Sequence, residues 1–503
     1  MKTILGKINL RWCLNCNVPV VGKKCGICGN KTSEVKITPP GDVRIGFPKD
    51  IEMINNILKE QFGVKDNNIF KNKIVLINKI PGTDFMKEII IDGKVFGILK
   101  YDEIGKEWKI LPSVEGGRRI IGNGGYKKIV AIKKDVVPYI LNKHASVLRP
   151  GITFLSESIK KGDEVIIVVD NLDSTNKSNP SNNFRPNDVI GVGKCRMDYE
   201  EVINITRGMV VKVRQKEDMG DIQYLPETGN FEESINKLIK ANYDIIKNRE
   251  RQAIGFIRNT LNKINKPPVV AYSGGKDSLV VLLLTMKSLG EEGIDFDVIF
   301  TDTTIEFDET IKNIKDISEK YGIDITIAKS KDFWNLVEKY GPPGRDYRWC
   351  SELCKMKPLE SITNKKYPNG FLTFVGLRKY ESFNRSKKPR IWQSPNIKNQ
   401  ILSAPILDWN ALEVWIYLFM NNAPYNTLYE RCFDRVGCYI CPAMELGEIE
   451  IVKKQYPNLW KRWENFLKDY AKKNNLDSDW INGGWRWKYK NKKIKKISNK
   501  NIK

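Results

Sequence analysis

The sequence predicts a multidomain α/β protein that ends in a doubly wound parallel-sheet domain. Three observations lead to this fold class. The 503 residues exceed what one hydrophobic core supports, so three or four domains are expected. Four cysteines near the start of the chain have the spacing of a small metal-held module. An apolar strand, a glycine-rich turn and a helix follow one another over residues 268–286, as at a phosphate-binding edge of an α/β sheet.

Composition limits the possible functions. The net charge of +24, from 84 basic and 60 acidic residues, favours a polyanionic partner such as RNA, although a surface of solvated lysines accounts for it too. We expect a cytoplasmic protein without a membrane partner, because neither a signal peptide nor a long apolar run is present. His144 is the one histidine, which excludes histidine-based catalysis and histidine-rich metal sites.

Residues 1–38 are predicted to form a zinc ribbon. Two Cys-x-x-Cys pairs stand eight residues apart, and together they comprise Cys13, Cys16, Cys25 and Cys28. Four thiolates around one Zn²⁺ provide the folding energy that so short a segment cannot obtain from a core. A rubredoxin-like iron site is the alternative. Such spacings are typical of metal sites in a reducing cytosol rather than of disulfides.

Two domains are expected after the ribbon. Residues 42–125 combine a helical pattern with short strands, which predicts a small α/β domain. Residues 126–215 hold strand-like runs between glycine and aspartate turns, which predicts a β-barrel. Its segments 147–152, 162–165 and 190–193 resemble the PUA domain. That resemblance implies binding to tRNA or rRNA, and a β-barrel without an RNA role is the alternative.

The remaining flanking segments are a linker helix over residues 232–265 and a helical extension with a basic tail over residues 446–503. The last eighteen residues hold nine basic side chains and no acidic one, which suits a nucleic-acid arm. Trp485, Trp487 and Tyr489 stand among the first of these charges. They either stack on bases or pack the last turn of the domain.

The glycine-rich turn opens the predicted catalytic domain, residues 266–445, and reads Ser273-Gly274-Gly275-Lys276-Asp277-Ser278. Its backbone N–H groups and the following helix start would face phosphate. Lys276 adds a positive charge, and the serines can donate hydrogen bonds. The turn lacks Walker spacing and resembles the PP-loop of ATP pyrophosphatases. That resemblance implies ATP with Mg²⁺, cleavage between the α- and β-phosphates, and catalytic roles for Lys276 and Asp277.

Further motifs resemble the PAPS reductase family. They begin at Asp302, Gly344, Lys357, Gly376, Pro405, Pro424 and Gly437. Asp302 ends a predicted strand, so its carboxylate is expected on the ligand side of the sheet, at the nucleotide or its Mg²⁺. Arg378 and Arg385 are the expected anion contacts, because a guanidinium fork matches phosphate or sulfate oxygens. Glu306 and Glu309 fit negative charges at a helix start.

A second cysteine set comprises Cys350, Cys354, Cys438 and Cys441. It resembles the [4Fe–4S] ligands of this family, with Ser351 in place of the second of two adjacent cysteines. Cys354 lies one helical turn beyond Cys350 and so shares its face. A cluster is the preferred interpretation, and structural zinc and free thiols are the alternatives.

The reductases of this family also use a C-terminal cysteine that attacks sulfur, and this chain has no cysteine after Cys441. Our preferred hypothesis is therefore ATP-dependent activation and transfer of sulfur, or a related group, to RNA. The second hypothesis is an adenylyl-sulfate or PAPS reductase that uses Cys432 or a thioredoxin-like external thiol. The third is a non-catalytic RNA-binding protein with a relic nucleotide site.

Overall fold

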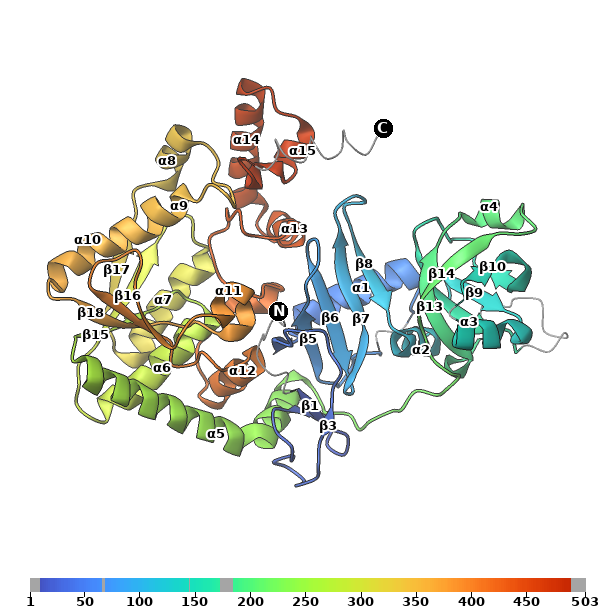
Figure 1. The fold of residues 1–503 in the computed structure, drawn as a ribbon, viewed down its shortest axis with the longest axis horizontal. Coiled ribbons are helices and arrows are strands. Elements are labelled where there is room, and N and C mark those ends of the chain that lie inside the picture. The colour runs from blue at the N-terminus through green and yellow to red at the C-terminus, as the bar shows by residue number, and fades with distance from the viewer. Residues whose placement is uncertain (1–9, 66–67, 144, 172–183, 490–503) are drawn as a thin grey trace. The chain divides into compact units, whose positions relative to one another are not determined.

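The computed structural model describes residues 10–65, 68–143, 145–171 and 184–489. His144 and the end of the basic tail, residues 490–503, lie outside the described residues. The chain divides into two compact units, and the boundary between Tyr243 and Asp244 falls within the long helix α5 (Phe231–Ile264). The predicted multidomain α/β class is confirmed (Figure 1).

The first unit begins with the cysteine-bearing ribbon and a five-stranded sheet. The ribbon is an antiparallel sheet of order β2-β1-β3, with β1 (Arg11–Cys13), β2 (Val18–Val20) and β3 (Ser33–Glu34). The second sheet is antiparallel in chain order, with β4 (Val43–Ile45), β5 (Val75–Lys79), β6 (Met86–Ile91), β7 (Lys94–Asp102) and β8 (Glu107–Pro112). Its helices are α1 (Pro48–Phe62) and α2 (Val114–Gly122). Proline in the first turn and Gly63 at φ 73° delimit α1.

A six-stranded sheet follows in the same unit. Its order is β10-β14-β13-β12-β9-β11, and its pairings are antiparallel except that of β12 with β9. The strands are β9 (Ile129–Ile132), β10 (Val147–Leu148), β11 (Ile152–Leu155), β12 (Glu164–Val169), β13 (Val189–Cys195) and β14 (Met209–Lys216). Helices α3 (Val137–Lys143) and α4 (Tyr199–Ile203) complete it. Valine and isoleucine from all six strands form its core.

The second unit is built on a mostly parallel sheet of order β17-β16-β15-β18-β20-β19. Its strands are β15 (Pro268–Ala271), β16 (Asp297–Asp302), β17 (Ile325–Lys329), β18 (Phe371–Phe374), β19 (Ile391–Gln393) and β20 (Gln400–Ser403), and only β19 runs antiparallel to its neighbour. The chain moves from β15 to β16 and β17, then returns to β18 on the other side of β15. The carboxyl end of β15 is thus a switch point, where open α/β sheets bind ligands.

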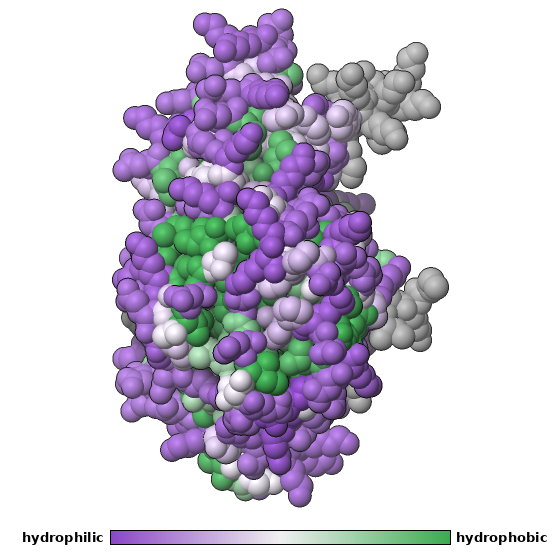
Figure 2. All heavy atoms as spheres, turned by 90° about the vertical axis from the view of Figure 1, so that its left-hand side faces the viewer, coloured by the Kyte–Doolittle hydropathy of each residue, from purple (hydrophilic) through white to green (hydrophobic). Residues whose placement is uncertain are grey.

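Helices connect these strands and extend the unit. They are α6 (Lys276–Gly290), α7 (Asp308–Tyr321), α8 (Phe333–Tyr340), α9 (Trp349–Ser351), α10 (Lys357–Lys366), α11 (Phe383–Ser386), α12 (Ala411–Met420), α13 (Leu446–Gln455), α14 (Pro457–Lys473) and α15 (Ser478–Ile481). Leu359 and Ile362 of α10 pack on Val269, Ile299 and Phe371 of the sheet. The face of the molecule in Figure 2 is largely hydrophilic, with apolar side chains gathered near its middle. Among the described helices, none combines the length and apolar character needed to cross a membrane.

Candidate functional site

The predicted phosphate-binding turn joins β15 to α6 at the switch point of the parallel sheet. Gly274 has a φ of 70°, which favours glycine. A Cβ there would also stand 2.9 Å from Cγ2 of Thr310, so space as well as conformation requires glycine at this position. Helix α6 begins at Lys276, directly after the glycines. The turn and the start of α6 therefore both lie at the carboxyl end of β15.

Hydrogen bonds within the turn fix its shape. The Ser273 N–H donates to Oγ of Ser278 at 3.1 Å, and that hydroxyl donates to the Gly275 carbonyl at 2.9 Å. The Lys276 N–H donates to the Tyr429 hydroxyl at 2.9 Å. Sequence reasoning assigned no role to Tyr429, although it stands in a family-like motif. Its hydroxyl holds the first residue of α6 in place.

Two ion pairs are buried behind the turn. Nζ of Lys276 lies 2.8 Å from one carboxylate oxygen of Asp277, and Nε of Arg378 lies 2.6 Å from the other. Burial opposes ionisation of Asp277, but the charges of Arg378 and Lys276 outweigh it and lower the pKa of this carboxyl. Arg378 is 1% exposed. In this arrangement it neutralises Asp277, and its contact with a nucleotide anion remains a prediction.

The other predicted nucleotide contacts lie at the same edge of the unit. Asp302 ends β16, as predicted, and its carboxylate accepts the Thr304 N–H at 2.8 Å. Arg385 is in α11 and forms an ion pair with Glu381. Each side chain contacts a residue within four positions of itself in the chain. The role of each toward a nucleotide remains a prediction.

A cavity of about 190 Å³ extends from the turn along the sheet. Tyr272 and Ser273 line one part of it, and Glu306, Lys355 and Gly437 line another. Apolar side chains of the sheet and α10 line the rest, among them Val269, Ile299, Leu359 and Phe371. Ligand pockets usually span roughly 300–1,000 Å³. The cavity is therefore smaller than a typical ligand pocket.

The second cysteine set lies beside this cavity. Sγ of Cys438 is 3.3 Å from Oγ1 of Thr303 and 3.6 Å from Oε1 of Glu306. Burial raises the pKa of the Cys438 thiol. The acidic groups around Lys355, which are those of Cys438, Glu306, Cys441 and Cys350, raise the pKa of the Lys355 ammonium. The Lys355 ammonium thus stands among thiols and a carboxylate. Sequence reasoning missed Lys355, although a cation next to Cys354 was an available signal. It also placed Glu306 at a helix start, whereas α7 begins only at Asp308.

The four cysteines of this set come from two segments. Cys350 is in α9, Cys354 is in a π-helical turn over Glu352–Met356, and Cys438 and Cys441 are in the loop before α13. Burial and the nearby Cys350 raise the pKa of Cys354 to about 11. Burial also raises the pKa of Cys350, and Cys441 adds to the effect. Sequence reasoning did not anticipate the π turn, a feature often found at functional sites.

The ribbon cysteines form a much tighter group. The sulfurs of Cys13, Cys16, Cys25 and Cys28 all lie within 4.8 Å of one another. Sγ of Cys13 and Sγ of Cys28 are 3.5 Å apart. Thiolates around one Zn²⁺ at about 2.3 Å lie slightly under 4 Å apart. This geometry fits a single tetrahedral ion.

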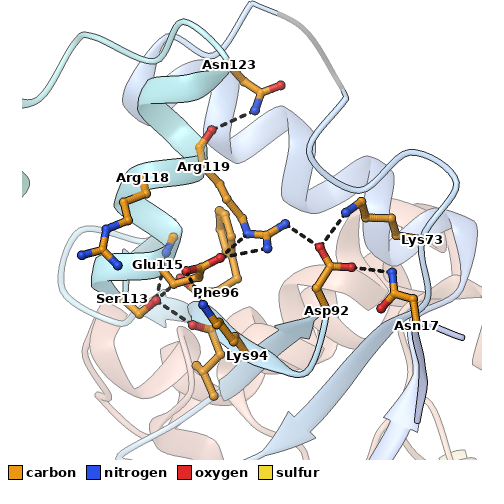
Figure 3. A network of polar contacts seen from close by, with 12 residues as sticks. Asn17, Lys73, Asp92, Lys94, Phe96, Ser113, Glu115, Arg118, Arg119 and Asn123 are labelled. Carbon is orange, nitrogen blue, oxygen red and sulfur yellow. Dashed lines mark hydrogen bonds and ion pairs between the residues drawn. The ribbon is translucent and has the colours of Figure 1, made fainter. Parts of the chain in front are cut away.

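A buried polar network fixes the ribbon to the rest of its unit (Figure 3). The Asp92 carboxylate accepts hydrogen bonds from Asn17 of the ribbon at 2.7 Å, from Lys73 at 2.5 Å and from Arg119 of α2 at 2.9 Å. Asn17 also accepts the indole N–H of Trp12 at 2.8 Å. Each charge in the network has an opposite partner, which is the condition for burying it. The ribbon, the five-stranded sheet and α2 therefore share one polar core.

Two further predictions concern Cys432 and the aromatic residues of the tail. Cys432 follows a 3₁₀ turn over Thr427–Arg431, is 4% exposed and has a φ of 69°. It is not among the residues that line the cavity. Trp485 is buried and packs edge-on against Trp463 at 5.1 Å, as expected for a residue that closes the domain.

The comparisons with known proteins agree with this architecture. A sequence profile of the phosphoadenosine phosphosulfate reductase domain matches residues 267–444. The chain belongs to the phosphoadenosine phosphosulfate reductase family. A profile of the PUA domain matches residues 128–216, so this family member carries a PUA domain on the same chain.

Relatives of two kinds match the chain. The uncharacterised protein MJ0066 of Methanocaldococcus jannaschii is 48% identical, over 97% of this chain and 98% of its own length. The uncharacterised protein MJ0973 of the same organism is 31% identical, over 89% of this chain and 96% of its own length. An adenosine 5′-phosphosulfate reductase of Geobacillus is 28% identical over 40% of this chain and 85% of its own. The two Methanocaldococcus proteins are thus similar along most of the chain, and the reductase similarity is confined to a part of it.

Proposed function

We propose that this protein uses ATP on the PP-loop to activate an RNA and then directs sulfur, or a related group, to the activated position. The observation that carries the proposal is the cavity shared by Ser273 of the loop and by Glu306 and Lys355, which surround Cys438. A nucleotide bound with its phosphates at the loop would lie next to the thiols. Activation and sulfur chemistry would then occur in one place.

The roles of the chain's own residues follow from their charges. The N–H groups of the turn and the start of α6 would hold the phosphates, and Lys276 would counter their charge. An oxygen of the RNA would attack the α-phosphorus of ATP, forming a P–O bond and releasing pyrophosphate. A sulfide-level sulfur would then displace AMP from the RNA carbon. Asp302 is the proposed ligand of Mg²⁺, and Lys355 the proposed partner of the incoming sulfur anion.

We propose that the second cysteine set holds a cluster and not a single ion. Its sulfurs do not form a group within 4.8 Å, in contrast to those of the ribbon. The corners of an iron–sulfur cube are separate atoms, so their thiolate ligands stand farther apart than ligands of one ion. Cys350, Cys354, Cys438 and Cys441 would hold a [4Fe–4S] cluster, and Lys355 would offset its negative charge. When bound, such a group supplies a place to hold sulfide or to pass electrons.

RNA is the proposed partner because three features of this chain suit it. The PUA domain belongs to a class that the sequence resemblance connects with tRNA and rRNA. The net charge of +24 favours a polyanion. The ribbon, which we propose binds zinc, carries Lys23, Lys24 and Lys31 beside its cysteines. These features have no evident use in an enzyme whose substrates are only small sulfonucleotides.

Pyrophosphate release tests the proposal directly. Protein purified without oxygen would be incubated with ATP labelled in its γ-phosphate, with and without bulk RNA. We expect labelled pyrophosphate only when RNA is present, and AMP only when sulfide is added together with RNA. Lys276→Ala should abolish the release, and Lys312→Ala on the exposed face of α7 should not change it. Release that is indifferent to RNA, or none at all, would contradict the proposal.

The second candidate is reduction of a sulfonucleotide, adenylyl sulfate or PAPS. The reductase relatives and the second cysteine set favour it. The burial of Cys432 speaks against it, since an external thioredoxin-like thiol would have to attack sulfur instead. Sulfite released from adenylyl sulfate in the presence of a dithiol, without any need for RNA, would establish this activity and displace the first proposal.

A further inference from the structure

Three segments of the second unit meet next to the second cysteine set. One is the turn over residues 344–347, which precedes Cys350. Another is the run Pro442–Met444, which follows Cys441. The third is a short piece near the end of the described chain, residues 486–489, which we call the C-terminal strap. The turn is closed by paired hydrogen bonds between Gly344 and Tyr347.

Arg345 connects the first two segments. Its Nε donates to the Pro442 carbonyl at 2.9 Å, and its Nη2 donates to the carbonyls of Ala443 at 3.2 Å and Met444 at 2.7 Å. A planar fork of donors is what allows one side chain to hold three successive carbonyls. Arg345 thereby fixes the segment that carries Cys350 against the segment that carries Cys441.

The strap holds this connection in place. The Arg345 N–H donates to the Arg486 carbonyl at 2.6 Å, and the guanidinium of Arg345 stacks on the Trp487 ring at 5.4 Å. Arg486 is itself buried and donates to the Met444 carbonyl at 2.7 Å. The Asp346 carboxylate accepts the backbone N–H groups of Lys488 at 2.8 Å and Tyr489 at 3.0 Å. Each end of the strap is therefore bonded to one of the two cysteine-bearing segments or to both.

We propose that the C-terminal strap is a positioning element that sets Cys350 at its working distance from Cys441. Asp346 and Arg345 act through it, and none of the three touches substrate. The proposal rests on the proposed use of these cysteines as one ligand set. The proposal also explains why the strap is there. The strap orders the segments that carry Cys350 and Cys441, which share no strand or helix and are separated by about ninety residues of chain.

Charge supports this interpretation over simple packing. Arg345 and Arg486 bring two guanidinium groups to the carbonyls that follow Cys441. They place positive charge close to the segment that carries Cys441, whose thiol must ionise to bind a metal group. A purely structural closure would be served by apolar side chains, which cost less to bury.

The test measures the proximity of the two thiols in the full-length, metal-depleted chain. A reagent that joins two nearby thiols is added briefly, and the joined Cys350 and Cys441 peptides are quantified by mass spectrometry. The yield is normalised to the recovery of the unjoined Cys350 and Cys441 peptides in the same sample. Asp346→Ala should lower the Cys350–Cys441 yield at least about tenfold, because the closed state loses both hydrogen bonds that this carboxylate accepts from Lys488 and Tyr489.

Asp477→Ala is the matched control. Asp477 also accepts a backbone N–H in the C-terminal extension, from Trp480 at 2.9 Å, but it contacts neither cysteine segment. We expect its yield to equal that of the wild type. Arg345→Lys is the second variant, because it keeps the charge and loses the fork, and it should lower the yield as Asp346→Ala does.

Each outcome decides the proposal. A thermal midpoint of unfolding near that of Asp477→Ala, together with a low yield, supports positioning. Equal yields in Asp346→Ala, Arg345→Lys and the wild type would overturn it. If Asp346→Ala does not fold, Arg345→Lys alone decides. Since the readout needs neither ATP nor RNA, failure of the proposed function leaves this result unaffected, and the reverse also holds.

Discussion

Gly376 gives the sharpest test of how the phosphate-binding turn is supported. This glycine follows β18, and a Cβ built there would lie 2.5 Å from the backbone N of Ser278, 2.6 Å from the carbonyl carbon of Asp277 and 2.8 Å from its oxygen. These are backbone atoms of the first turn of α6, so no side chain can rotate away. We expect Gly376→Ala to push the two segments apart, at a cost of roughly 1–3 kcal/mol.

The loss should appear in nucleotide binding as well as in stability. The displaced residues carry the Asp277–Arg378 pair and the Ser278–Ser273 hydrogen bond. If most of the strain is relieved by distortion of the turn, ATP affinity falls roughly 5- to 150-fold, which is the binding equivalent of that cost. Titration calorimetry with ATP measures the affinity, and thermal unfolding measures the stability.

Gly255→Ala is the control for replacing glycine by alanine at a position where the added Cβ has open space. Gly255 lies inside α5, and a Cβ there meets no heavy atom within 4 Å. Alanine in a helix should raise stability by roughly 0.5–1 kcal/mol and leave ATP affinity unchanged. Gly376→Ala with wild-type affinity and an unchanged unfolding midpoint would show that β18 does not buttress the turn, and the reasoning from close approach would be wrong.

Three other predictions concern polar groups. Asn17→Ala should lower the free energy of unfolding by about 3 kcal/mol in urea titrations, because the Trp12 indole and the Asp92 carboxylate lose a buried partner; a change below the error of the titration would contradict the network. Removing the ribbon metal with a chelator should speed amide hydrogen exchange first within the ribbon, residues 10–35, and uniform exchange across the unit would argue against a metal-held ribbon. The lowered pKa of Asp277 means that its ion pairs stabilise the fold above the ordinary aspartate pKa of about 3.9 and cease to do so as the pH falls through the folded value. The stability difference between wild type and Asp277→Asn should therefore shrink in acid, and a difference that is constant with pH would refute the assignment.

Local patterns in the sequence predicted much of the fold. The strand before Ser273 and the helix after it were expected, because the glycine-rich turn constrains both neighbours. The four ribbon cysteines were expected to meet, and they do so because two short Cys-x-x-Cys turns leave little freedom. Four strands of the PUA domain, β9, β12, β13 and β14, were predicted within a few residues, because valine and isoleucine runs lie between turn residues there. The short strands β10 and β11 were not predicted.

Contacts between residues that are far apart in the chain could not be predicted from the sequence. The position of Arg378 against Asp277 depends on β18 lying beside β15, which no local pattern reveals. Tyr429 reaches the start of α6 from a loop more than a hundred residues away in the chain. The position of Lys355 among the thiols becomes apparent only when the two cysteine-bearing segments come together in the fold. The spacing of cysteines in the sequence can indicate a ligand set. The charged and hydrogen-bonding side chains that neutralise and orient those ligands come from elsewhere in the chain.

The strap has a consequence for biosynthesis. Residues 345 and 486 meet in the folded protein, although the ribosome makes them far apart in time. A nascent chain that has already formed the PUA domain and the parallel sheet would still lack the part that orders the second cysteine set. RNA could be bound during synthesis, but the cysteine centre would be completed only after Tyr489 has emerged. Loading of any metal group there is therefore expected to follow the emergence of Tyr489 from the ribosome.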